Sequence, residues 1–120
     1  MLKKIEIRTK KRIELVDITD DIQRVIQESG IKSGICTIFT THTTAGITIN
    51  ENADPNVQAD IIKAINKIVP EHDNYLHDSV DNNAAAHIKS SIIGVSKAIP
   101  IKDRIIRTIN NITSDKFPIK

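Results

Sequence analysis

The segment from Asp54 to Pro70 constrains the fold of this chain more than any other part of its sequence. Asp54 is suited to cap a helix, and Pro55 fits its first turn, where proline has no hydrogen bond to lose. Pro70 ends the segment. Between them, apolar residues recur at helical spacing: Val57, Ile61, Ile62, Ile65, Ile68 and Val69. The sequence therefore predicts an amphipathic helix over residues 55–69.

Most of the remaining chain alternates apolar and polar residues, as strands do. Alternation over residues 2–18 predicts a hairpin, residues 31–40 and 45–50 two further strands, and the tail from residue 95 two or three more. Helical spacing recurs over about 19–29 and 84–93, each followed by a glycine. The order ββ-α-ββ-α-α-βββ predicts one α+β domain over residues 1–120, with about seven mostly antiparallel strands and three helices.

Two sheets of this size would be covered only in part by three helices. An exposed sheet face is usually buried against another chain, so we expect a homo-oligomer with closed symmetry. The composition of the chain also limits which classes of partner it is expected to bind. The net charge is only +2, which disfavours binding of nucleic acid through bulk charge. No apolar run approaches the ~20 residues of a membrane span. The single cysteine, Cys36, fits a reducing, cytoplasmic compartment.

Histidines and acids gather in one part of the sequence. Acids outnumber bases between Glu51 and Asp81, and all four histidines lie in or beside this stretch: His42, His72, His77 and His87. Imidazole beside carboxylate suits a divalent metal site, although no spacing here matches a known zinc signature. Surface or capping roles for the same histidines stay open.

Two polar runs precede the helix predicted at residue 55. Thr40 to Thr44 places hydroxyls around His42, where they could orient an imidazole or bind phosphate, or could form a turn without a ligand. Asn50 to Asp54 offers oxygen ligands for Mg²⁺, with helix capping by Asp54 as the alternative. Cys36 lies in a predicted buried strand without a nearby base, so the sequence offers no convincing nucleophile.

The basic N-terminal segment gives weaker evidence for a binding site. Its Lys and Arg residues could bind phosphate or nucleic acid. More often, such residues lie on a solvent-exposed sheet edge and protect it from aggregation. They are Lys3, Lys4, Arg8, Lys10, Lys11 and Arg12.

Three separated blocks resemble the YjbQ/UPF0047 family. They are Thr41 to Pro55 (THTTAGITINENADP), Asn74 to Asp78 (NYLHD) and Ala84 to Gly94 (AAAHIKSSIIG). The resemblance implies a small two-sheet β-sandwich with helices, assembled as a homotrimer. It also implies a secondary thiamine-phosphate synthase activity, in which a pyrimidine pyrophosphate and a thiazole phosphate form thiamine phosphate and pyrophosphate.

The family's functional positions can be carried over residue by residue. The resemblance implies His42, His77 and His87 as ligands of a divalent metal, Zn or Mg. It suggests Asp78 and Glu51 as catalytic carboxylates. The residues that would contact a small phosphorylated substrate are Thr43, Thr44, Asn52, Asp54 and Asn82.

The tail departs from the family pattern. Ile109 and Asn110 stand where the family has Trp and Gln. If those two residues touch the substrate in relatives, this chain binds another molecule or has lost catalysis. The alternative hypothesis is therefore a non-catalytic trimer that binds a metal or another ligand.

Overall fold

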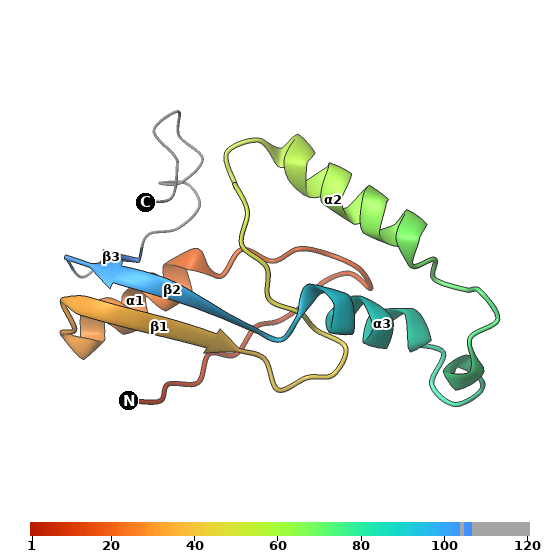
Figure 1. Cartoon of the computed structure of the whole chain (residues 1–120), viewed down its shortest axis with the longest axis horizontal. Helices are drawn as coiled ribbons and strands as arrows, with labels where there is room; N and C mark the ends of the chain where they lie inside the picture. The colour runs from red at the N-terminus through yellow and green to blue at the C-terminus, as the bar shows by residue number, and fades with distance from the viewer. Residues whose placement is uncertain (104, 107–120) are drawn as a thin grey trace.

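The computed structural model describes residues 1–103 and 105–106 of the 120-residue chain. Figure 1 shows the elements in chain order. They are α1 (Thr19–Ser29), β1 (Ser33–Phe39), α2 (Pro55–Ile68), the 3₁₀ helix η1 (Leu76–Ser79), α3 (Ala84–Ile93), β2 (Ser96–Lys102) and β3 (Ile105–Ile106). None of the helices in this described part is long and apolar enough to cross a membrane.

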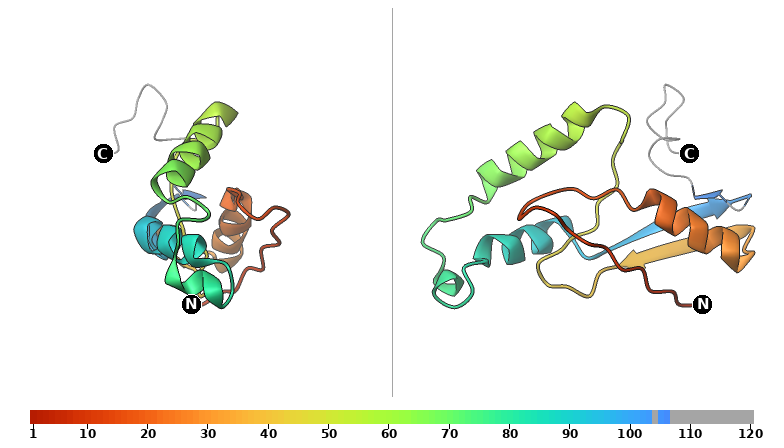
Figure 2. Two further views of the ribbon diagram at one scale, coloured as in Figure 1. Left: turned by 90° about the vertical axis from the view of Figure 1, so that its right-hand side faces the viewer. Right: turned by 180° about the vertical axis from the view of Figure 1, so that it is seen from behind.

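The strands form one antiparallel sheet in the order β1-β2-β3. Cys36 of β1 pairs with Ile99 of β2. Helix α1 covers one face of this sheet, as Figure 2 shows from behind. The core lies between them and contains Ile22, Ile26, Ile99 and Ile101. Because side chains alternate along a strand, one face of β1 and β2 fills this core and the other does not.

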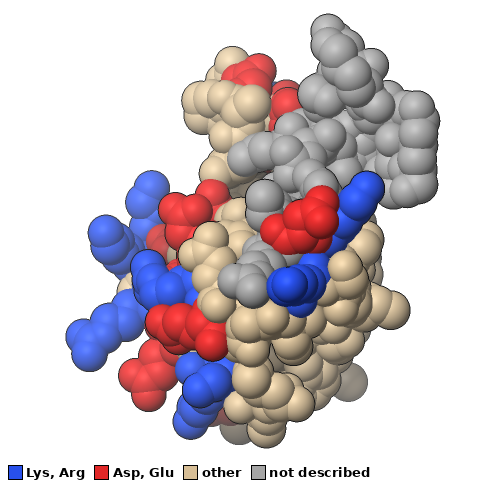
Figure 3. All heavy atoms as spheres, turned by 90° about the vertical axis from the view of Figure 1, so that its left-hand side faces the viewer, with Lys and Arg blue, Asp and Glu red and all other residues tan. Residues whose placement is uncertain are grey.

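The opposite face of the sheet is uncovered in a single chain. Ile35 is 74% exposed and Phe39 is 62% exposed, and Pro100 is the register partner of Ile35. In Figure 3, charged side chains gather on the side of the molecule that carries α1, whereas the side of the sheet's outer face is largely uncharged. An apolar face of this kind is the surface that the sequence predicted would need a partner.

Helix α2 begins as the sequence predicts. The side chain of Asp54 accepts a hydrogen bond from the backbone N–H of Asn56 at 2.9 Å, and Pro55 is the first helical residue. Yet none of the residues of α2 is buried, and Ile68 near its end is 70% exposed. Figure 1 shows α2 extending away from the sheet. Its apolar stripe is therefore only partly covered in one chain: Val57, Ile61, Ile62 and Ile65 are half-buried, and Val69, just after the helix, is buried.

Polar contacts help to hold α2 beside α3. Lys89 of α3 is buried, at 9% exposure, and its ammonium donates to the side-chain oxygen of Asn66 of α2 at 2.5 Å. The loop after α2 is held by the hydroxyl of Tyr75, which donates to the carbonyl of Pro70 at 2.8 Å.

The expected two-sheet sandwich of about seven strands is wrong. Residues 2–18 contain no strand, and neither do residues 45–50. Alternation makes a segment suitable for a sheet, but a strand also needs a neighbour to pair with its backbone. Residue Ile47 makes one such contact, since its N–H donates to the carbonyl of Gly94 at 2.9 Å. Any strand expected beyond residue 106 lies outside the described residues, whereas the three expected helices are present.

Candidate functional site

The predicted site residues lie in three places. His77, Asp78, Asn82 and His87 belong to η1, α3 and the turn between them. Glu51, Asn52 and Asp54 precede α2, and His42, Thr43 and Thr44 lie in the loop after β1.

The first place brings two predicted metal ligands together. The rings of His77 and His87 are in edge-to-face contact, with 4.9 Å between their centroids and 84° between their planes. They line an open pocket of about 360 Å³. The rest of its lining is mostly apolar: Tyr75, Leu76, Ala84 and Ile88. This contact is possible because η1 and the first turn of α3 are joined by a short turn and pack against each other.

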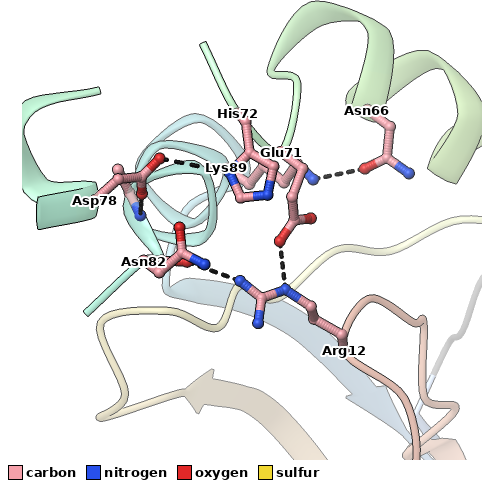
Figure 4. Close-up of polar contacts among 8 residues, drawn as sticks. Arg12, Asn66, Glu71, His72, Asp78, Asn82 and Lys89 are labelled. Carbon is pink, nitrogen blue, oxygen red and sulfur yellow. Dashed lines mark hydrogen bonds and ion pairs between the residues drawn. The ribbon is translucent and has the colours of Figure 1, made fainter. Parts of the chain in front are cut away.

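Carboxylates accompany the histidines of this region. Nε2 of His77 lies 3.8 Å from Oδ2 of Asp81. Nδ1 of His72 lies 3.7 Å from Oδ2 of Asp78. Figure 4 marks this contact with a dashed line. The other oxygen of Asp78 accepts a hydrogen bond from the backbone N–H of Ala84 at 3.0 Å. Asp78 thus satisfies a free donor at the start of α3, which is also where a carboxylate is favoured by the helix dipole.

The surroundings of the pocket change the pKa of the Tyr75 hydroxyl. Desolvation raises the pKa of the Tyr75 hydroxyl above its usual value of 10.0, and the nearby carboxylates of Asp73 and Asp78 raise this pKa further. Tyr75 therefore remains a neutral hydrogen-bond donor at physiological pH.

The second place is a smaller pocket in front of α2. Its volume is about 130 Å³, and Asp17, Glu51 and Asn52 contribute polar groups to an otherwise largely apolar lining. The amide of Asn52 donates to Asp17, and the amide of Gln58 donates to the side-chain oxygen of Asn52. Asp54 caps α2 instead, as the alternative reading of the sequence allowed.

The carboxylate of Asp17 has a lowered pKa. The side chain of Thr19 is the largest cause, followed by the backbone N–H of Thr19, which donates to Oδ1 at 2.9 Å, and Asn52 adds a smaller effect; burial opposes them. A pKa lowered by folding stabilises the folded state above the unfolded value of about 3.8 and loses that effect as pH falls through the folded value.

We therefore expect Asp17→Asn to lower the free energy of unfolding at pH 7. The difference from the wild type should shrink below about pH 4, where the wild-type carboxyl becomes protonated. Urea denaturation of both proteins at pH 7 and pH 3 measures this change. An equal difference at the two pH values would contradict the assignment.

The third place holds the hydroxyl-rich loop. The N–H of Ala45 donates to the carbonyl of His42 at 3.3 Å and closes a turn with the side chains of His42, Thr43 and Thr44 exposed. The buried hydroxyl of Ser90 donates to the carbonyl of Ala45 at 2.5 Å. The loop thus lies against the C-terminal half of α3, whereas His87 belongs to its N-terminal half.

These positions limit what one chain can do with a metal ion. Residues 1–103 and 105–106 contain no group of three or more His, Cys, Asp or Glu side chains placed to hold one. The pair of His77 and His87 provides two suitable nitrogen donors. In the same described residues, the buried side-chain oxygen of Asn83, between η1 and α3, has no hydrogen-bond partner.

Some residues of the first place were not predicted as functional. The sequence marks Asp81 as one of the local acids and as part of the turn before residue 84, and its position four residues after His77 also indicates a pair within one helical turn. Tyr75 was seen only as part of a motif, yet it lines the pocket. Arg12 was read as part of a basic segment, and no local pattern could have placed it beside residues 71 and 82.

The chain matches the family described as UPF0047 protein YjbQ-like over residues 3–108. UPF0047 protein MJ1081 of Methanocaldococcus jannaschii is 53% identical over 103 residues, which are 86% of this chain and 73% of the relative. UPF0047 protein YugU of Bacillus subtilis is 45% identical over 104 residues, which are 86% and 77% of the two chains.

Two solved structures that resemble this chain are also described as YbjQ-like or YjbQ/UPF0047 proteins. A YbjQ-like protein of unknown function from Sulfolobus solfataricus superimposes with a TM-score of 0.79 at 34% identity, covering 83% of this chain and 72% of that one. A YjbQ/UPF0047 protein from Clostridium acetobutylicum gives a TM-score of 0.72 at 43% identity, covering 77% and 70%. The resemblance found in the three sequence blocks is thus confirmed, and the chain belongs to the UPF0047 family of YjbQ-like proteins.

Proposed function

We propose that this protein is a metal-dependent enzyme that acts on a phosphorylated small molecule. The observation that carries the proposal is the contact between His77 and His87 at an open pocket. Two imidazoles bound to one tetrahedral ion at ~2.0–2.1 Å would have ring centres about 5 Å apart. The observed 4.9 Å is compatible with that arrangement.

The cofactor in this proposal is a divalent ion, Zn or Mg, with His77 and His87 as two of its ligands. His42 is the third proposed ligand, and it would come from a neighbouring copy in a homotrimer. When bound, such an ion would offset charge on a phosphate or pyrophosphate group. The chain's own contribution is to orient the imidazoles: Asp81 faces Nε2 of His77, and Asp78 fixes the start of the helix that carries His87.

The specific reaction we propose is formation of thiamine phosphate from a pyrimidine pyrophosphate and a thiazole phosphate. The motifs shared with the family support it. In this proposal Asn82 and the hydroxyls of Thr43 and Thr44 bind phosphate oxygens, and Glu51 and Asn52 serve the second pocket. The single free cysteine, Cys36, supports action in a reducing compartment such as the cytoplasm.

The test is a condensation assay on the purified full chain, with metal content measured in the same sample. Turnover that stops on chelation and returns on adding Zn²⁺ or Mg²⁺ is the expected result. Absence of turnover with either ion, in protein that contains stoichiometric metal, would overturn the specific reaction.

A second candidate function is ligand binding without catalysis. It is favoured by the mostly apolar lining of the 360 Å³ pocket, which offers few groups for chemistry beyond the two imidazoles. The same assay separates the two functions, because this candidate predicts saturable binding of a phosphorylated molecule with no product.

We further propose that the protein works as a homotrimer that buries the outer face of the sheet. The exposure of Ile35 and Phe39 supports this. Ile35→Lys should therefore convert the assembly to monomers, because it would bury an unpaired charge. Gln27→Lys, which adds the same charge on the exposed side of α1, should leave it intact. Sedimentation velocity measures both, and an unchanged assembly in Ile35→Lys would contradict this choice of face.

A further inference from the structure

Arg12 joins the two ends of the loop that carries His77. Its Nε donates to a carboxylate oxygen of Glu71, and its Nη2 donates to the backbone carbonyl of Asn82 at 2.7 Å. Figure 4 shows the guanidinium between these two partners. Residues 71 and 82 lie near the two ends of the segment 69–83, which contains η1. One side chain from the N-terminal segment thus closes the base of this loop.

In the described part of the chain, the loop also has polar contacts of its own: the hydroxyl of Tyr75 donates to the carbonyl of Pro70, and Asp78 accepts from the backbone N–H of Ala84. Helix α2, which leads into it, buries none of its own residues, and Leu76 and Val80 within the loop are exposed. Asn74 and Asn82 both have φ of 56°, a left-handed conformation that asparagine tolerates better than most residues. Apolar burial lies at the two ends of the segment, at Val69, Ala84 and Ala85, so polar contacts supply much of the restraint between them.

The energy of the ion pair alone does not explain this contact. The side chain of Arg12 is 61% exposed and that of Glu71 is 32% exposed, so solvent screens their attraction. An arginine can instead fix the positions of two acceptors, because its planar guanidinium donates hydrogen bonds in two directions at once. One group can thereby set the distance between Glu71 and Asn82.

We propose that Arg12 is a positioning residue that holds the loop so that His77 meets His87. The proposal deepens the function proposed above, and it rests on the role given there to the two imidazoles. Without the bridge, the two ends of the loop are free to separate and η1 shifts relative to α3. The imidazole contact is then lost although both histidines are present.

The test compares the full-length wild type with Arg12→Ala, Arg12→Lys and Arg8→Ala. Arg8 is an exposed arginine of the same segment that has no hydrogen bond or ion pair with the described residues, so it controls for loss of charge. The first readout is the NMR shifts of the His77 and His87 ring protons, which report the edge-to-face contact without any metal. The second is the affinity for Zn²⁺ by calorimetry.

Arg12→Ala should remove the ring-current shift and weaken Zn²⁺ binding by about tenfold or more, the size of effect seen when a group that orients a ligand is lost. Arg12→Lys should fall between, since an ammonium can pair with Glu71 but lacks the planar fork. Arg8→Ala should match the wild type. Should Arg12→Ala not fold, Glu71→Gln removes the ion pair and is expected to change the ring shifts in the same direction.

Wild-type ring shifts in folded Arg12→Ala would overturn the proposal. Failure of the proposed function gives a different result: the wild type would bind no Zn²⁺, while the ring shifts would still depend on Arg12.

Discussion

Replacement of His77 by alanine is expected to weaken Zn²⁺ binding by at least about a hundredfold and to abolish turnover in the condensation assay. The loss should exceed the roughly 10- to 100-fold typical of residues that only orient a ligand, because His77 is itself a proposed ligand. His87→Ala should have the same effect, since the two rings are in contact. Calorimetry with Zn²⁺ and the assay of product measure the two losses.

His72 provides the matched control for this experiment. It lies in the same loop and also faces a carboxylate, that of Asp78, but it does not line the pocket. His72→Ala should therefore retain Zn²⁺ affinity and turnover within a few-fold of the wild type. Equal losses in His72→Ala and His77→Ala would show that removal of any imidazole disturbs the loop, and would remove the special role of His77.

Ile99→Ala is expected to lower the free energy of unfolding by about 3 kcal/mol, within the range for a large-to-small change in a packed core. Ile99 is 6% exposed and belongs to the cluster between the sheet and α1. Removing its side chain leaves a cavity between two elements that can move together only in part. Urea denaturation at a fixed protein concentration measures the change.

Ile68→Ala is the control, with the same change of side chain at a position that is 70% exposed. It should alter the free energy of unfolding by no more than about 0.5 kcal/mol. A similar loss in the two variants would mean that Ile68 is buried in solution, and so that α2 has a partner there.

The helices were predictable because their signals are local. Asp54 and Pro55 define the start of α2, and Gly30 follows the end of α1 with φ of 73°, as its position in the sequence indicated. Strands depend on a neighbour as well as on their own pattern. The alternation of residues 2–9 was real, and Ile5 does pack against the core, but the segment has no strand structure.

In the candidate site too, contacts between residues close in the sequence were predictable and long-range contacts were not. The meeting of His77 with His87 is a contact over ten residues, and the shared motifs pointed to both. The bridge from Arg12 spans 59 residues to Glu71 and 70 residues to Asn82, and no period or motif encodes it. Contacts of that range depend on how the whole chain packs, which is why the sequence suggested for this arginine only a contact with phosphate or nucleic acid or a solvated sheet edge.

The uncovered outer face of the sheet has a consequence for how this protein melts. In the homotrimer proposed above, a chain that buries this apolar surface against copies of itself would gain stability by mass action. The temperature of half-unfolding should then rise with protein concentration, and dilution alone should bring the protein closer to unfolding.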